Sequence, residues 1–283
     1  MKEKPAMPQN DLVFKKLFAD EKNKDILIDF IRDITRLKVA DVEHVMNPYN
    51  VRNYQSELDE VGDDDYGFTI VDLKVKLING ETVIVEMQNA REENFVKRLM
   101  YYGATSFVES YHHKYAEIKA VHVIALMDFK LDFKDDVSNL KSFKMTDEFG
   151  NELEDLVQIH LVELKKIKPD DPNGNLLRFM VKFFTEGIVA KGAPRWLAKI
   201  GDRYRHLNFT KEEKKLISRA ERNRADIEDS KLYYTNRGIE RGKRNIISNL
   251  VDSGMSIEQI ALLTKLSNEQ VEKILEVGGK EID

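Results

Sequence analysis

The chain has 283 residues and no cysteine, and it carries a formal net charge of −5 at pH 7. A cysteine-free sequence excludes disulfides, thiolate nucleophiles and zinc–thiolate sites, so any metal must be held by oxygen or imidazole ligands. Hydrophobic residues make up 42% and charged residues 34%, which excludes a disordered chain, and no apolar run is long enough for a membrane helix or a signal peptide. We therefore expect a folded cytoplasmic protein without a membrane segment.

The first part of the chain alternates between helical and extended patterns, which is typical of the α/β class. Apolar residues at helical spacing predict three helices there, and runs rich in β-branched residues predict four strands. The helices are expected at residues 11–19, 24–37 and 92–115, and the strands at 68–77, 81–88, 121–129 and 156–164.

The β character disappears after Pro169-Asp170-Asp171-Pro172, which predicts a domain boundary near residue 170. The expected parts are a core over residues 1–170, a helical and partly basic arm over 171–250, and a C-terminal unit over 251–283. Residues 203–245 hold thirteen Lys or Arg against seven Asp or Glu. This local excess of positive charge suits contact with nucleic acid, although a solvated helix of mixed charge gives the same pattern.

The strands at 68–77 and 81–88 are separated by a short Asn-Gly loop and predict a β-hairpin. Side chains alternate along a strand, so each strand has one apolar and one polar face. Glu86 and Gln88 share the polar face of the second strand, and Asp72 and Lys74 share that of the first. If both apolar faces turn toward the core, the two polar faces coincide.

The turn of this hairpin decides which residues oppose each other. A two-residue Asn79-Gly80 turn would set Asp72 opposite Met87, on the wrong face. A three-residue loop with a left-handed Gly80 sets Asp72 opposite Glu86 instead. We therefore predict the three-residue loop and an opposed pair of carboxylates, which destabilises a sheet unless something such as a cation compensates the charge.

Two carboxylates beside an amide suit Mg²⁺ or Mn²⁺, which are hard ions that take oxygen ligands and retain waters. Such an ion lowers the pKa of a bound water and neutralises charge that builds up on a phosphate. Lys74, on the same face, could orient that water or balance the phosphate. The spacing alone is also compatible with the solvated polar face of an amphipathic hairpin.

Further residues around this hairpin form a recognisable set. The set comprises Asp11-x-x-Phe14-Lys15-x-x-Phe18, the strand with Asp72, Val85-Glu86-Met87-Gln88, and Phe95-x-x-Arg98-x-x-x-Tyr102. In this order, these segments resemble the recombination-promoting nuclease/putative transposase family, a branch of the PD-(D/E)XK nucleases. The resemblance implies a restriction-endonuclease-like core, with a mixed β-sheet flanked by helices, and Mg²⁺-dependent hydrolysis of DNA.

The resemblance also implies roles for single residues. Asp72 and Glu86 would be metal ligands, and Asp11 would match an acid of the first helix near the metal, although the start of a helix favours an acid in any case. Gln88 occupies the position of the motif's lysine and lacks the positive charge that would stabilise an anionic transition state. Activity could therefore be weaker, or Lys74 could supply the charge.

Arg98 and Tyr102 lie one helical turn apart and could contact the phosphate backbone of DNA. A surface salt bridge and a packed aromatic ring explain the two residues about as well.

Two capping boxes near the end of the chain, Ser256-x-x-Gln259 and Ser267-x-x-Gln270, each open a short apolar-periodic helix. The segment is similar to a helix-turn-helix at the end of this family, which would offer its second helix to a DNA major groove. That helix has almost no basic surface, so oligomerisation through the C-terminal helices or docking of a partner is the alternative. Arg241 and Arg244, just upstream, could provide phosphate contacts instead.

Two functions thus follow from the sequence. The first is a Mg²⁺- or Mn²⁺-dependent DNA endonuclease that acts in recombination or transposition, with Asp72 and Glu86 holding the ion and Gln88 and Lys74 positioning water and phosphate. The second is a catalytically weak or inactive nuclease fold that serves as a DNA-binding or partner-binding module.

Overall fold

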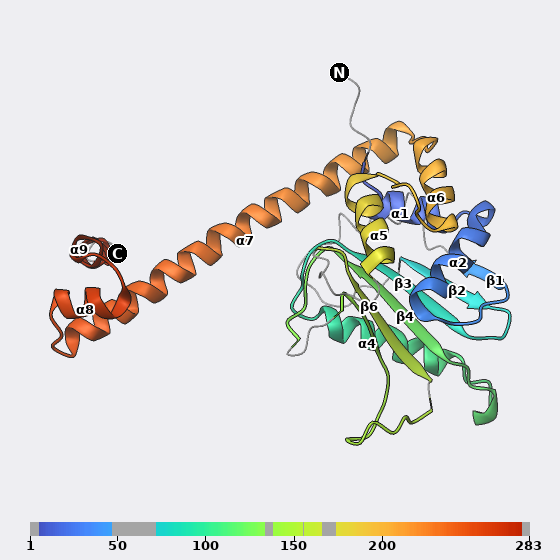
Figure 1. Cartoon of the computed structure of the whole chain (residues 1–283), viewed down its shortest axis with the longest axis horizontal. Helices are drawn as coiled ribbons and strands as arrows, with labels where there is room; N and C mark the ends of the chain where they lie inside the picture. The colour runs from blue at the N-terminus through green and yellow to red at the C-terminus, as the bar shows by residue number, and fades with distance from the viewer. Residues whose placement is uncertain (1–5, 47–71, 134–137, 155, 166–173, 279–283) are drawn as a thin grey trace. The chain divides into compact units, whose positions relative to one another are not determined.

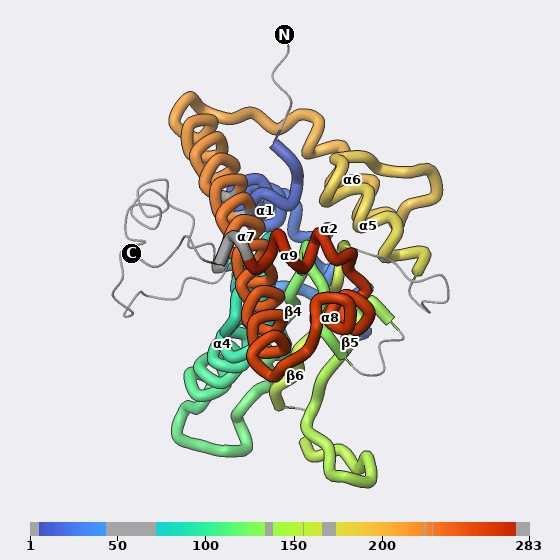
Figure 2. The backbone as a smooth tube through the Cα atoms, turned by 90° about the vertical axis from the view of Figure 1, so that its left-hand side faces the viewer, coloured from blue at the N-terminus to red at the C-terminus, as the bar shows by residue number. Residues whose placement is uncertain are grey.

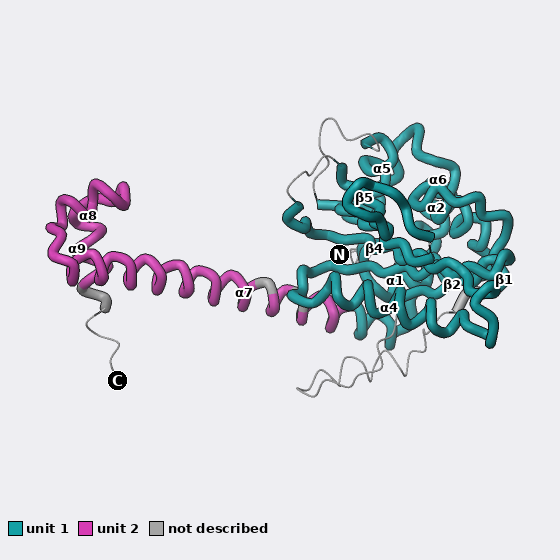
Figure 3. Tube along the Cα trace, turned by 90° about the horizontal axis from the view of Figure 1, so that it is seen from below, with its two compact units in different colours: residues 1–217 teal, residues 218–283 magenta. Residues whose placement is uncertain are grey.

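The computed structural model describes residues 6–46, 72–133, 138–154, 156–165 and 174–278 (Figure 1). The chain divides into two compact units, residues 1–217 and 218–283, which Figure 3 shows in different colours. No helix in these described ranges combines the length and the apolar character needed to cross a membrane.

A mixed six-stranded sheet forms the centre of the first unit, in the order β1-β2-β3-β4-β6-β5. The neighbours β3, β4 and β6 are parallel, and the other pairs are antiparallel. The strands are β1 (Val42–Met46), β2 (Leu73–Leu77), β3 (Thr82–Gln88), β4 (Val121–Met127), β5 (Leu140–Phe143) and β6 (Val157–Glu163). Every residue of the central strand β4 is buried, as expected for a parallel strand with both faces covered.

The β2–β3 hairpin has the predicted three-residue loop. The N–H of Leu77 donates to the carbonyl of Glu81 (2.8 Å), so these two residues close the ladder around Ile78-Asn79-Gly80. Gly80 has a φ of 87°, a left-handed conformation that glycine adopts without strain. The register pairs Leu73 with Val85, and one step further sets Asp72 against Glu86. The predicted register is therefore confirmed.

Helices cover both faces of this sheet (Figure 1). Four of them build a core on one face, and one packs on the other. The first set is α1 (Asp11–Phe18), α2 (Lys24–Thr35), α5 (Gly174–Glu186) and α6 (Arg195–Arg205), with the 3-10 turn η1 (Glu21–Asn23) before α2; the opposite face carries α4 (Phe95–Glu109), followed by η2 (Tyr115–Glu117). In the hairpin, Val85 faces the first core and Ile84 the second, so the face that bears Asp72 and Glu86 is the face beside α4.

Aromatic packing fixes α1 against its neighbours. The rings of Phe14 and Phe18 stack at 4.7 Å, and Phe18 also contacts Phe30 of α2 and Phe184 of α5. Such ring pairs add about 0.5–1.5 kcal/mol each beyond the burial of their area. The helix that carries Asp11 is thus held rigidly beside the sheet.

The first unit extends beyond the predicted boundary near residue 170, a position that itself lies outside the described residues. Helices α5 and α6, side by side in Figure 2, bury Leu177, Phe183 and Trp196 in the same core as α1 and α2. Helices α5 and α6 therefore belong to the same compact unit as the sheet, and the second compact unit begins at Ser218.

The second unit consists of most of α7 (Lys211–Asp252) together with α8 (Ile257–Thr264) and α9 (Asn268–Gly278). Both predicted capping boxes form: the side chains of Gln259 and Gln270 accept from the backbone N–H groups of Ser256 and Ser267, and the serine hydroxyls accept in return. A small core centred on Ile247, buried together with Ile260 and Val271, holds the three helices together. The two short helices are as predicted, and their use in DNA binding stays a prediction.

Candidate functional site

Two carboxylates meet where β2 begins and β3 ends. Asp72 is 4% exposed and Glu86 is 5% exposed, and they face each other across the hairpin. One oxygen of Asp72 accepts a hydrogen bond from the backbone N–H of Met87 (2.7 Å), which fixes its side chain against β3. The polar face of the hairpin is therefore not a solvated surface at this point.

The first helix adds two charged residues to this pair. Lys15 is 4% exposed, and its ammonium lies 3.0 Å from the second oxygen of Asp72. Asp11 lies one helical turn earlier, and its charge contributes to the electrostatics of Glu86. The first helix thus contributes one cation and one anion to the site.

The pKa of the buried Glu86 is strongly shifted. Burial, followed by the negative charge of Asp72, raises the pKa of Glu86 well above its usual range, and Asp11 acts in the same direction. The cation Arg98 opposes this shift. A carboxylate that is destabilised in this way binds a proton or a cation readily, because either one neutralises the buried charge.

An unpartnered oxygen on Glu86 is a further reason why the two carboxylates suit a divalent cation. Among the described residues, Oε1 of Glu86 is a buried acceptor without a hydrogen-bond partner, and Nε of Arg98 is a buried donor in the same condition. No group of three or more His, Cys, Asp or Glu in the described ranges is arranged as a ready metal cage. Mg²⁺ rarely requires such a cage, since one or two carboxylates complete its shell with waters and substrate phosphates.

Gln88 holds a short network at the end of β3. Its carbonyl accepts from Nη2 of Arg98 (2.6 Å), and its amide donates to the carbonyl of Ala90 (2.9 Å) and to Glu92 (2.8 Å). Glu92 in turn accepts from Nη1 of Arg98 (2.6 Å). Gln88 thus provides an amide that orients an arginine.

Tyr102 lies one turn after Arg98 on α4 and is buried beside the carboxylates. Burial, and next the charge of Glu86, raise the pKa of Tyr102 above its usual value. Its hydroxyl therefore stays protonated near neutral pH and is a hydrogen-bond donor.

The structure brings Asp11, Asp72, Glu86, Gln88, Arg98 and Tyr102 together, but it does not bring Lys74 to them. Lys74 forms an ion pair with Glu109, at the other end of α4. Arg241 and Arg244 belong to the second unit, where Arg241 is exposed and Arg244 is half-buried.

Lys15 is the site residue that sequence reasoning missed. The signal was its spacing, because Asp11 and Lys15 are four residues apart on a helix whose other residues are mostly buried and apolar. The neighbouring Lys16 points elsewhere and pairs with Glu213 (2.7 Å). A lysine in phase with an acid on an apolar helix is a candidate for a buried ion pair.

A second set of polar side chains, His122, His160 and Ser142, lies in the sheet. Nδ1 of His122 is 3.3 Å from Nε2 of His160, and Nδ1 of His160 is 2.8 Å from the hydroxyl of Ser142. Burial, and next the neighbouring His122, lower the pKa of His160 to about 3. His160 is therefore neutral in the folded protein throughout the physiological range.

This shift predicts a loss of stability in acid. An unfolded histidine titrates near 6.5, so between pH 6.5 and 3 the unfolded chain binds the extra proton and stability falls as pH falls. Between pH 7 and pH 5, this effect of His160 is expected to lower the free energy of unfolding by about 2 kcal/mol. Urea unfolding followed by the fluorescence of Trp196, the only tryptophan, measures this in the first unit.

The matched variants are His160→Gln, which cannot titrate, and His206→Gln, which removes an exposed histidine. The first should lose less stability between pH 7 and 5 than the wild type, and the second should lose as much. Equal losses in the wild type and in His160→Gln would contradict the prediction.

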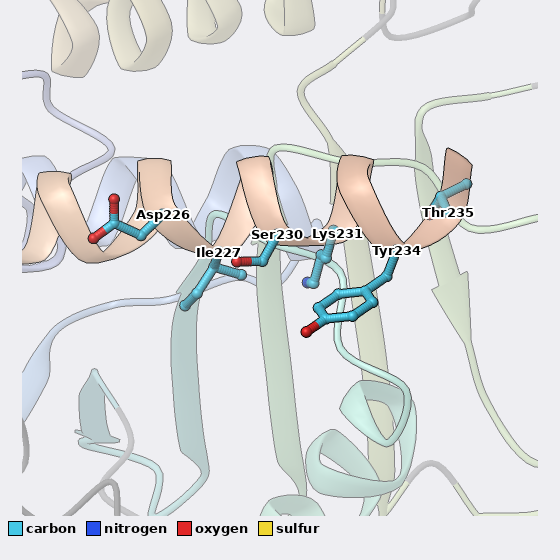
Figure 4. Close-up of a pocket in the computed structure, with 6 residues that line it drawn as sticks. All are labelled: Asp226, Ile227, Ser230, Lys231, Tyr234 and Thr235. Carbon is cyan, nitrogen blue, oxygen red and sulfur yellow. The ribbon is translucent and has the colours of Figure 1, made fainter. Parts of the chain in front are cut away.

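A groove of about 410 Å³ lies along α7 in the second unit (Figure 4). All of its lining residues come from this one helix: Asp226, Ile227, Ser230, Lys231, Tyr234 and Thr235. Because a single helix supplies the lining, its polar groups do not converge from several elements as those of a catalytic site do.

Comparison with known proteins identifies the family of the chain. The family model described as PD-(D/E)XK nuclease family transposase matches residues 8–235, which include every residue of the cluster. No curated protein and no solved structure matches the chain. The mixed sheet flanked by helices has the arrangement of a PD-(D/E)XK α/β fold. The chain therefore belongs to the PD-(D/E)XK nuclease family transposases.

Proposed function

We propose that the protein is a Mg²⁺-dependent DNA endonuclease, with Mn²⁺ as a substitute ion, that acts in recombination or transposition in the cytoplasm. The observation that carries this proposal is the buried, directly opposed pair Asp72 and Glu86, with an unpartnered oxygen on Glu86. Membership in a nuclease family supports DNA as the substrate.

Asp72 and Glu86, with Asp11 nearby, would hold the ion. A divalent cation held there would lower the pKa of a bound water molecule and neutralise charge on the scissile phosphate. Lys15 keeps Asp72 in place through its 3.0 Å ion pair and adds positive charge to the site.

Around these carboxylates, other side chains would bind and orient the phosphate. Gln88 and Glu92 hold the guanidinium of Arg98 at the edge of the site, where it can bind a phosphate oxygen. The protonated hydroxyl of Tyr102 is a second donor. Lys15 and Arg98, rather than Gln88 or Lys74, would supply the charge that the motif normally takes from its lysine.

Cleavage of plasmid DNA with Mg²⁺ and with EDTA tests this proposal. The wild type should convert supercoiled plasmid to nicked or linear forms only with the ion, and Asp72→Ala should not. Equal activity of the two proteins would exclude Asp72 as a ligand.

A second candidate function is a weak or inactive nuclease fold that binds DNA or a partner. The amide of Gln88 favours it, because its contacts with Ala90, Glu92 and Arg98 are structural and it brings no charge. Tight metal-independent binding of DNA by a wild type that never nicks it would support this function over the first.

For the second unit we propose phosphate contacts by Arg241 and Arg244, and self-association through the C-terminal helices. Leu262 and Leu263 of α8 are 84% and 63% exposed, so they present adjacent apolar side chains at the surface. Sedimentation of the wild type and of Leu262→Ser/Leu263→Ser tests the association; identical monomers in both would exclude it.

A further inference from the structure

A cavity of about 330 Å³ lies at the end of the hairpin opposite the carboxylates. It is bounded by the β2–β3 loop, by the last turn of α4 and by the segment that follows α4. Three lysines, Lys74, Lys76 and Lys119, line it, together with hydroxyls that include Thr82 and Ser106. Basic and hydroxyl donors in one cavity suit a phosphate group rather than an apolar ligand.

The charges in the cavity are only partly compensated. Lys74 pairs with Glu109, whereas Lys76 is 3.7 Å from an exposed carboxylate of Glu43, a separation at which a surface pair contributes little. Within the described ranges, the ammonium of Lys119 has no ion-pair partner. Glu109 and Glu117 are the acids in the lining, so the three lysines leave a positive excess.

The aliphatic part of Lys119 is held in place by the turn. A Cβ on Gly80 would come within 3.1 Å of Cγ of Lys119, so the side chain lies directly over the glycine. The left-handed glycine that sets the hairpin register therefore also makes room for this lysine.

The cavity and the carboxylates share one face of β2. Asp72, Lys74 and Lys76 alternate along the strand and so point to the same side, beside α4. A rise of about 3.3 Å per residue sets Lys76 about 13 Å from Asp72 along the strand. Both places therefore lie within reach of the sugar-phosphate backbone of one bound DNA duplex.

We propose that this cavity binds a backbone phosphate of the DNA, on the same face of the hairpin as the carboxylate cluster but away from the bond that is cut there. The inference rests on the proposed function for the identity of the substrate. It gives Lys74, Lys76 and Lys119 a role in substrate binding, separate from the chemistry at Asp72 and Glu86.

The test measures binding of the full chain to a short fluorescent DNA duplex in EDTA, over a series of KCl concentrations. Each phosphate contact that is lost should reduce the slope of log K against log salt by about 0.9. Lys119→Ala is expected to show this reduction, and Lys119→Arg is expected to keep the wild-type slope. The matched control is Lys191→Ala, an exposed lysine between α5 and α6, on the other side of the sheet.

Equal slopes for Lys119→Ala and Lys191→Ala would overturn the proposal. A second contrary outcome is that inorganic phosphate stabilises the wild type but not Lys119→Ala, while the two proteins show the same slope for DNA binding. That result would overturn the proposal and assign the cavity to a small anion. If the wild type cleaves plasmid and Lys119→Ala keeps the wild-type slope, the nuclease function stands and the phosphate-binding role of the cavity is contradicted. If Lys119→Ala shows a reduced slope but the wild type never cleaves DNA, the phosphate-binding role of the cavity is supported and the nuclease function is contradicted.

Discussion

Glu86→Gln is expected to lower Mg²⁺-dependent DNA cleavage by roughly 10²- to 10³-fold and, at the same time, to make the metal-free protein more stable. The loss of activity follows from removing a ligand to an ion that contributes several kcal/mol to transition-state stabilisation. The gain of stability follows because Glu86 is buried opposite Asp72, and a neutral amide removes that repulsion. Plasmid cleavage and urea unfolding in EDTA measure the two effects.

The gain has a defined pH dependence. The pKa of Glu86 is raised in the folded protein above the unfolded value of about 4.3, so the folded state binds the proton more tightly. The stability that protonated Glu86 contributes to the wild type is therefore lost as pH rises above its unfolded pKa of about 4.3. Glu86→Gln should not show this loss. The control is Glu93→Gln, an exposed carboxylate nearby that should change neither activity nor stability. A variant at Glu86 that is fully active, or less stable than the wild type at pH 8, contradicts the assignment.

Lys15→Met is expected to destabilise the first unit by about 3–5 kcal/mol, because it leaves the buried carboxylate of Asp72 without its cation. The fluorescence of Trp196 during urea unfolding in EDTA reports this change. A large part of the loss reflects the unpaired charge rather than the ion pair itself.

The double variant Lys15→Met/Asp72→Asn separates these contributions. It removes the buried charge together with its partner, so it should be clearly more stable than Lys15→Met alone. A cost below about 1 kcal/mol for Lys15→Met, within the range of an exposed pair, would show that Lys15 is not buried against Asp72 in solution.

The hairpin could be predicted from the sequence because its determinants are local. Alternation fixed which residues share a face, and the requirement that both apolar faces turn toward the core selected a three-residue loop with a left-handed Gly80. The structure confirms each of these features. The edge strands β1 and β5 escaped prediction, and β5 has only four residues and does not alternate in burial.

The environment of the carboxylates could not be predicted, because distant segments create it. Asp72 is buried because α1 supplies Lys15 from far away in the sequence and α4 packs on the same face. Lys74 appeared suited to the site from its face alone, but Glu109 on α4 draws it away. Alternation identifies a face, and only tertiary packing decides what that face contacts.

Titration of Mn²⁺ into the full chain, followed by electron paramagnetic resonance, tests most directly whether the carboxylate pair is a metal site. The wild type is expected to bind the ion, and Glu86→Gln, which should be folded and at least as stable, is expected to lose that binding. Unchanged Mn²⁺ binding in Glu86→Gln, or no binding by the wild type, would contradict the account.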